Sequence, residues 1–145
     1  MRTFDPKELE TNVFHQILLG SVVPRPIALA STVDADGVVN LSPFSFFNCF
    51  SANPPILVFS PARSGRTGET KHTHDNVKEV AEVVINVVTY DMVQQMSLAS
   101  SPYPKGVDEF IKTGFTPIES ELVKPYRVKE SPVQLECTVE NVIEL

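Results

Sequence analysis

Hydrophobic and polar residues alternate with a period of two in several short segments of the chain, which is the period of a β-strand. The first clear case is 26–33, which is followed by the turn residues of 34–37 and by a second apolar run over 38–51. Gly37 supplies the positive φ that a tight turn needs. The pattern predicts a β-hairpin whose second strand bends at Pro43, because proline cannot donate a ladder hydrogen bond and belongs at an edge or a bulge.

Further elements follow from the same kind of pattern. Strands are predicted at 56–59, 83–88 and 132–143, and helices at about 70–80 and 91–99. The 12 prolines are spread so that long helices fit only between about 62 and 101. The segment 100–128 reads as loop, and the alternation of the tail slips at Asn141, which indicates a bulge. We therefore expect one mainly β domain over 1–145 with a few helices, preceded by an extension over 1–20.

Composition narrows the class of protein. The chain has 145 residues, of which 42% are hydrophobic and 21% charged, and its net charge is -6. An acidic balance disfavours nucleic-acid binding, and no apolar run approaches the roughly 20 residues of a membrane-spanning helix. The first ten residues carry net negative charge, which is the wrong sign for a secretory signal. Cys49 and Cys137 lie far apart in apolar segments and are predicted to be small buried hydrophobes. A cytoplasmic protein is expected.

The segment 42–48, SPFSFFN, combines three aromatic rings with two hydroxyls and an amide on a bent strand. Flat apolar surfaces beside short hydrogen-bonding groups suit a large planar heteroaromatic ligand. The alternative is that the phenylalanines belong to the core and the serines satisfy backbone groups of a bulge.

The segment 61–74 carries a local charge of +2 within an acidic chain, from Arg63, Arg66 and Lys71 against Glu69. If a helix begins near Thr70, its free N–H groups point to the same place as Lys71 and the Thr73 hydroxyl, which together would suit a phosphate. The alternative is a capped surface helix beside a solvated basic loop. His72 and His74 do not form a metal site by themselves. Positions that differ by two in sequence point about 200° apart on a helix, and no carboxylate or cysteine completes a set of ligands.

Three motifs together resemble a known family. They are PRPIAL-STVD-G-N from Pro24 onward, the strand S-PFS-FN that ends in two prolines, and the KHTHDN helix start that leads into the next strand. Over about 20–143 the chain resembles the flavin reductase-like proteins with the FMN-binding split-barrel fold, an antiparallel barrel of Greek-key type.

The resemblance implies that FMN binds at a homodimer interface, with NAD(P)H as the electron donor. By position, the first strand would end with Ser31, Thr32 and Val33, and the phosphate would be held by Lys71 and Thr73. The flavin ring would be lined by Ser45, Phe46, Phe47 and Asn48. Reduced nicotinamide would pass hydride to the flavin, so no catalytic acid or base is implied.

Two departures from the family pattern bear on this expectation. His72 and His74 stand where relatives often carry Asp and an apolar residue, which leaves their part in phosphate binding open. The strand pattern stops at Glu144 and Leu145 without a turn or polar tail, which predicts a chain truncated at its C-terminal end, with part of the family domain missing.

Three functions are open on this evidence. The first is an NAD(P)H:flavin oxidoreductase, with a partner oxygenase as a candidate recipient of reduced flavin. The second is an electron carrier that retains FMN, and the third is a flavin-binding or structural domain without catalysis.

Overall fold

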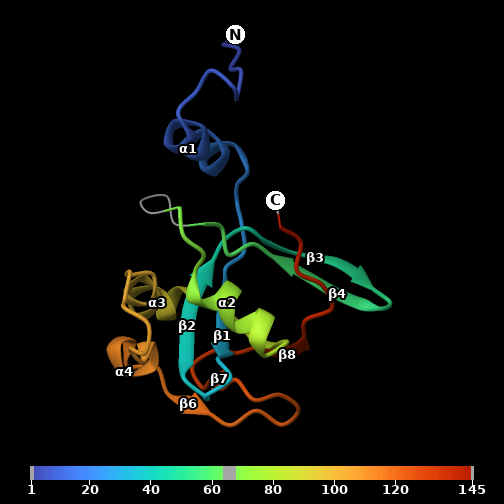
Figure 1. Ribbon diagram of the computed structural model, residues 1–145, viewed down its shortest axis with the longest axis vertical. Helices are drawn as coiled ribbons and strands as arrows, with labels where there is room; N and C mark the ends of the chain where they lie inside the picture. The colour runs from blue at the N-terminus through green and yellow to red at the C-terminus, as the bar shows by residue number, and fades with distance from the viewer. Residues whose placement is uncertain (1, 64–67, 145) are drawn as a thin grey trace.

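The structure is a computed structural model that describes residues 2–63 and 68–144. Its elements are labelled in Figure 1. The helices are α1 (Thr11–Ser21), α2 (His72–Glu79), the 3-10 helix η1 (Tyr90–Met92), α3 (Val93–Ala99) and α4 (Glu109–Thr113). The strands are β1 (Ala28–Val33), β2 (Val39–Phe44), β3 (Phe47–Ala52), β4 (Pro55–Phe59), β5 (Glu82–Val87), β6 (Pro117–Ile118), β7 (Arg127–Val128) and β8 (Gln134–Thr138). The described residues thus form eight strands and five helices, which confirms the mainly β fold with a few helices.

An antiparallel sheet in the order β2-β1-β5-β8 is the centre of the fold. The predicted hairpin is confirmed, because β1 pairs with β2 through a turn in which Gly37 has a φ of 83°. Pro43 lies opposite Leu29 in β2, and β2 is an edge strand, as proline requires. The expected single strand over 38–51 with a bend at Pro43 is instead two strands. β2 runs through Pro43 to Phe44 in regular register, and the chain leaves the sheet at Ser45 and Phe46 before it begins the separate β3–β4 hairpin.

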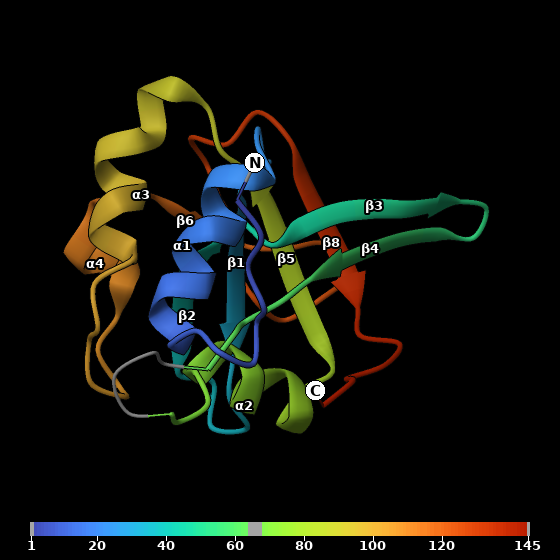
Figure 2. The same cartoon turned by 90° about the horizontal axis from the view of Figure 1, so that it is seen from above.

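All six residues of β1 are buried, because helices or strands cover both faces of the sheet. Alternation along β1 sends Leu29 to one face and Ala28 and Ala30 to the other. The Leu29 face holds the buried cluster Leu29, Leu41, Met92, Ala99, Phe110, Phe115 and Val128. The Ala30 face holds the buried cluster Ala28, Ala30, Phe44, Val77, Val83 and Ile85. Helices α3 and α4 pack beside each other at β2, whereas α2 lies on β1 and β2 from the Ala30 side (Figure 2).

Two helices differ from expectation. The longest described helix is α1, with 11 residues, so the restriction of long helices to 62–101 is wrong. The interval between Pro6 and Pro24 contains no proline and is long enough for α1, which has no buried residue and projects from the body of the molecule (Figure 1). Helix α4 lies in the segment predicted as loop. The Asp108 side chain accepts hydrogen bonds from the backbone of its first turn, and Gly114 ends it with a φ of 71°.

The tail and the cysteines also correct the sequence reading. Strand β8 ends at Thr138, so the slip at Asn141 lies outside any described strand and makes no bulge. A register shift occurs instead in the β3–β4 hairpin, between Cys49 and Ser51. Cys49 is exposed because that hairpin projects from the body, whereas Cys137 is partly buried and burial raises the pKa of its thiol. Among residues 2–63 and 68–144, no helix combines the length and apolar character needed to cross a bilayer.

Candidate functional site

The junction between β2 and β3 joins several parts of the chain. Arg25 Nε donates a hydrogen bond to Ser45 Oγ at 3.3 Å, and Arg25 Nη1 donates to the backbone oxygens of Leu19, at 2.8 Å, and of Val22. One guanidinium therefore connects the end of α1 to the point where the strand leaves the sheet. The His15 ring stands edge-on to Phe46 with 5.9 Å between ring centroids, which adds a second contact between α1 and this junction.

Lys71 lies beside Phe44, the last residue of β2 before this junction. It immediately precedes α2, and its Nζ is 5.2 Å from the centre of the Phe44 ring, within the range of a cation–π contact. The Phe44 ring lies 5.6 Å from that of Phe59, and Phe59 is opposite Phe47 in the β3–β4 hairpin. The two candidate segments of the sequence, 42–48 and 61–74, are therefore neighbours in space.

The ammonium of Lys71 has an aromatic ring, that of Phe44, as a described neighbour. Its side chain is exposed overall, yet partial burial of the ammonium lowers its pKa from the ordinary lysine value. Within the part of the chain that the structure describes, no carboxylate lies at ion-pair distance from Lys71. An anionic ligand group at this place would stabilise the charged form of Lys71 and would oppose the effect of burial.

Two reciprocal hydrogen bonds fix α2 on the sheet. Asn40 Nδ2, from β2, donates to Thr73 Oγ1 of the helix at 2.9 Å. Asn76 Nδ2, from the helix, donates to Thr32 Oγ1 of β1 at 3.1 Å. Thr32 and Asn40 are directly opposite each other in the sheet, and all four side chains are buried. This pair of bonds holds α2, and with it the preceding Lys71, against the sheet.

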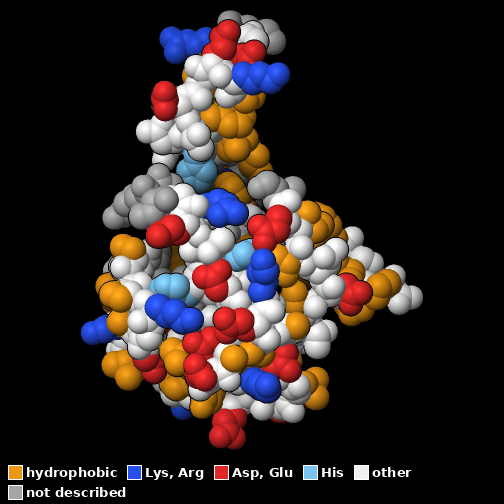
Figure 3. Space-filling model, viewed as in Figure 1, with side chains coloured by type: hydrophobic (Ala, Val, Ile, Leu, Met, Phe, Trp, Pro, Cys, Tyr) orange, Lys and Arg blue, Asp and Glu red, His pale blue; other side chains and the backbone are white. Residues whose placement is uncertain are grey.

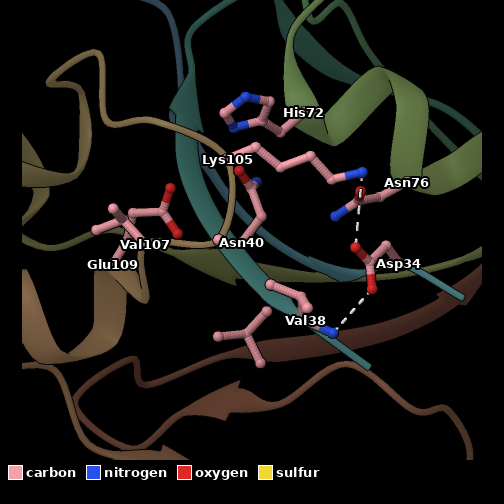
Figure 4. Close-up of a pocket in the computed structure, with 10 residues that line it drawn as sticks. Asp34, Val38, Asn40, His72, Asn76, Lys105, Val107 and Glu109 are labelled. Atoms are coloured by element: carbon pink, nitrogen blue, oxygen red, sulfur yellow. Dashed lines mark hydrogen bonds and ion pairs between the residues drawn. The ribbon is translucent and has the colours of Figure 1, made fainter. Parts of the chain in front are cut away.

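A small polar pocket lies next to these bonds (Figure 4). Asp34 accepts a hydrogen bond from the Val38 backbone N–H at 2.9 Å and pairs with the Lys105 ammonium at 3.7 Å. Glu109 Oε2 accepts from the Leu41 backbone N–H at 3.2 Å, and burial raises the pKa of its carboxyl. The cavity measures only about 10 Å³, which suits about one water molecule, so this pocket has a structural role and is too small for a cofactor.

The structure separates the predicted site residues by exposure. Ser45, Phe46 and Phe47 are half-buried, and Asn48 and Lys71 are exposed. The side chains of Ser31, Thr32, Val33 and Thr73 are buried within the fold, and Ser31 Oγ has no hydrogen-bond partner among residues 2–63 and 68–144. Arg66, which contributed to the predicted basic segment, lies outside the described residues. The assignment of these nine positions to a ligand stays a prediction.

Sequence reasoning missed four residues that the structure brings to the site: Arg25, Asn40, Phe44 as the partner of Lys71, and Asn76. An arginine between two prolines and an asparagine within an apolar strand were the available signals, because both are unusual in such surroundings. Over the described ranges, no group of three or more His, Cys, Asp or Glu side chains could hold a metal ion.

Comparison with known proteins gives a consistent result. The flavin reductase like domain matches residues 19–145. An uncharacterized protein of Aquifex aeolicus (strain VF5) is 41% identical over 135 residues, which cover 92% of this chain and 68% of that protein. The crystal structure of nitrilotriacetate monooxygenase component B from Bacillus cereus is 34% identical, with a TM-score of 0.94 over 100% of this chain and 71% of that one.

A third match bears on the architecture. A Shewanella frigidimarina structure described as a flavin reductase with a split barrel domain is 28% identical, with a TM-score of 0.75 over 95% of this chain and 68% of that one. The predicted split-barrel fold is therefore confirmed. The chain spans about two thirds of the length of the curated relatives that it matches.

Proposed function

Because the chain belongs to the flavin reductase-like family, we propose that it binds FMN beside Lys71 and the β2–β3 junction and passes electrons from NAD(P)H through it. The observation that carries this proposal is the contact between Lys71 and Phe44, at 5.2 Å. It joins a cation suited to a phosphate with aromatic residues suited to a flat ring, although the two lie far apart in the sequence.

The residues present fit such a ligand. An ammonium without a carboxylate partner in the described chain can bind an anion such as a phosphate. The half-buried rings of Phe46 and Phe47 supply apolar surface, and the Ser45 hydroxyl and the exposed Asn48 amide supply polar contacts. The buried Thr73 contributes by holding the helix start through Asn40, and a direct contact with phosphate is not needed for that role.

The flavin, when bound, supplies the redox chemistry by accepting a hydride from reduced nicotinamide and passing electrons onward. The chain's own residues have a simpler task. Lys71 neutralises and positions the anionic end of the ligand, and the phenylalanines exclude water from its apolar part. Arg25 keeps the end of α1 against Ser45, which holds the junction in one conformation.

The similarity to a monooxygenase component B supports a partner oxygenase as the acceptor of reduced flavin, which we include in the proposal. We also propose a homodimer, as the family resemblance implies. The cytoplasmic location stays a prediction.

An absorbance spectrum before and after anaerobic addition of NADH or NADPH, with FMN supplied, tests the proposed activity. Bleaching of the flavin bands is the expected result, and turnover with excess free FMN distinguishes a reductase from an electron carrier. Protein that binds FMN but leaves it oxidised with both nicotinamides would contradict the reductase proposal, and protein that binds no FMN would contradict the whole assignment.

The phosphate assignment has its own test. We expect Lys71→Ala to weaken FMN binding about tenfold or more, since a charge-assisted hydrogen bond contributes about 1.5–3 kcal/mol. Riboflavin, which has no phosphate, should lose little affinity. Lys78→Ala is the matched control, because Lys78 lies on α2, which Lys71 immediately precedes, and pairs with Glu144 at 3.0 Å. Equal FMN dissociation constants for Lys71→Ala and the unsubstituted protein would rule out the assignment.

A further inference from the structure

Arg25 lies between two prolines, and this position restricts its backbone. Pro24 and Pro26 have no N–H to donate, and the residue before a proline is limited to extended conformations. The half-buried side chain therefore leaves the backbone in few directions, and it reaches back to the end of α1. Arg25 is a fixed group and not a solvated surface arginine.

The end of α1 supplies two acceptors that hold the guanidinium. The last carbonyl groups of a helix have no partner within it, and the helix dipole favours a cation at that end. Arg25 Nη1 donates to the carbonyl oxygens of Leu19, at 2.8 Å, and of Val22. Figure 3 shows the N-terminal part standing out from the body with hydrophobic side chains exposed along it, and α1 has no buried residue. The contacts at its base, from Arg25 and between His15 and Phe46, therefore hold α1 against the body.

The remaining bond of this guanidinium determines how the Ser45 hydroxyl can act. Arg25 Nε donates to Ser45 Oγ at 3.3 Å, and an arginine side chain carries donors only, so the hydroxyl oxygen is the acceptor. The adjacent cation polarises the O–H bond, which makes the hydroxyl a stronger donor and a weaker acceptor. Within residues 2–63 and 68–144, no group accepts a hydrogen bond from Ser45 Oγ. The Ser45 proton is therefore available to a ligand.

Ser45 stands between the two groups that we assign to the ligand. It directly follows Phe44, whose ring is 5.2 Å from Lys71 Nζ, and it directly precedes Phe46. A half-buried donor at this place suits a ring whose hydrogen-bonding atoms are mostly acceptors. The isoalloxazine ring of a flavin is of this kind, since carbonyl oxygens and ring nitrogens accept and a single N–H donates.

We propose that Arg25 is a positioning residue of the flavin site, which fixes the Ser45 hydroxyl as a hydrogen-bond donor to an acceptor atom of the flavin ring. The inference rests on the proposed function, because it needs a flavin at the β2–β3 junction. It divides recognition into two tasks, in which Lys71 binds the phosphate and Ser45, set by Arg25, binds the ring. It also gives α1 a role, since the helix end holds the guanidinium that sets Ser45.

Riboflavin separates the two tasks, because it has the ring without the phosphate. We expect Ser45→Ala to weaken FMN and riboflavin binding equally, by about three- to tenfold, which is the effect of one lost hydrogen bond. Lys71→Ala should weaken FMN binding alone. Fluorescence titration with each flavin measures the dissociation constants. Unchanged constants in Ser45→Ala, together with the expected result for Lys71→Ala, would overturn the inference alone. Protein that binds neither flavin would overturn the proposed function and the inference together.

A double-mutant cycle tests whether Arg25 acts through Ser45. Arg25→Met removes every donor while it keeps an unbranched side chain, and it should weaken binding of both flavins about as much as Ser45→Ala does. In the Ser45→Ala background, the same substitution should change either dissociation constant less than twofold. An arginine that only stabilised the fold, or that contacted the flavin itself, would cost the same affinity in both backgrounds. That result would overturn the inference.

Arg25→Gln separates the bond to Ser45 from the bonds to α1. The glutamine amide nitrogen occupies the chain position of arginine Nε, so it keeps a donor for Ser45 Oγ and loses the donor to the α1 carbonyl groups. Affinity for both flavins should lie between those of the unsubstituted protein and Arg25→Met. Affinity as low as that of Arg25→Met would overturn the role of Ser45. This variant also replaces Arg25→Met in the cycle if removal of every donor unfolds the chain.

Arg127→Met is the matched control. Arg127 is also half-buried, and it donates to one backbone carbonyl, that of Glu119, from Nε at 3.1 Å and Nη2 at 2.7 Å. It lies in β7, which belongs to a separate sheet from the junction. Its dissociation constants for both flavins should change less than twofold. A loss equal to that of Arg25→Met would show a general effect of removing a half-buried arginine and would overturn the inference.

Discussion

The two faces of the central sheet are built for different purposes. On the Leu29 face, Leu29 and Leu41 are almost fully buried, and Phe110 of α4 is buried with them in one cluster. On the Ala30 face, β1 offers only small residues, so α2 lies close enough for Asn76 to reach Thr32 at 3.1 Å, and the remainder of the face borders an open groove. The Leu29 face is therefore the more fully packed side of the sheet, and the proposed FMN site lies on the Ala30 side.

Removing a large side chain from each face gives the largest expected effect. Phe110 is 2% exposed, and Phe110→Ala should lower the free energy of unfolding by about 3–5 kcal/mol, because it leaves a cavity. Phe59 is only partly buried beside Phe44, so Phe59→Ala should cost clearly less. Urea unfolding of both variants checks the difference. Equal losses would show that the Ala30 face is as well packed as the Leu29 face.

Removing a hydrogen bond between α2 and the sheet should give the next largest loss of unfolding free energy. Asn76→Ala leaves the buried Thr32 hydroxyl without its donor and should cost about 1–3 kcal/mol in unfolding free energy. Since Asn76 holds the helix that Lys71 immediately precedes, FMN binding should weaken as well, whereas riboflavin binding should be affected less. Calorimetric titration with both ligands checks this.

A double variant shows whether the two bonds act together. Asn40 and Thr32 lie opposite each other in β2 and β1, and each is hydrogen-bonded to α2, Asn40 to Thr73 and Thr32 to Asn76. The losses of unfolding free energy from Asn40→Ala and Asn76→Ala should therefore not be additive in the double variant. Strict additivity would mean that each bond holds α2 independently of the other.

Much of the fold was predictable because local patterns encode it. The hairpin at Gly37 and the edge position of Pro43 follow from turn chemistry and the missing proline donor. The helix predicted from about Thr70 begins at His72. Helix α4 had a signal that was overlooked, since Asp108 and Gly114 stand at its two ends as caps do. Helix α1 was harder to predict, because none of its residues is buried and it does not depend on an apolar face that packs on the core.

The site was predictable in its parts and not in its assembly. The aromatic strand and the basic helix start could each be recognised from residue types alone. Their proximity depends on Phe44 and Lys71 meeting at 5.2 Å, which no local pattern encodes. The exposure of Cys49 was missed for the same reason, since an apolar strand pattern does not show whether its hairpin joins the core or projects from it.

A pH titration of binding probes the Ala30 face with a smaller effect. Only the charged form of Lys71 attracts phosphate, so FMN affinity should fall as pH rises through the Lys71 pKa. Burial lowers that pKa, so the fall should begin at a lower pH than for an ordinary lysine. Measuring dissociation constants above about pH 7.5 keeps a phosphate monoester, with its second pKa near 6, fully ionised. Riboflavin should show no such fall, and a parallel fall for both ligands would remove Lys71 as the cause.

The smallest effect is expected at Glu109, on the border of the Leu29 face. Burial raises the pKa of its carboxyl in the folded protein, so its contribution to stability is fully present below the pKa of the unfolded chain and is lost as pH rises through the folded pKa. Glutamine keeps an oxygen for the Leu41 N–H, which is 3.2 Å away, without the charge. The unfolding free energy of Glu109→Gln should therefore rise relative to the unsubstituted protein between acidic and neutral pH. Carboxyls with lowered pKa values, such as Glu130, are present in both proteins and cancel in the difference. Urea midpoints that differ by the same amount at every pH would show that Glu109 carries no buried charge.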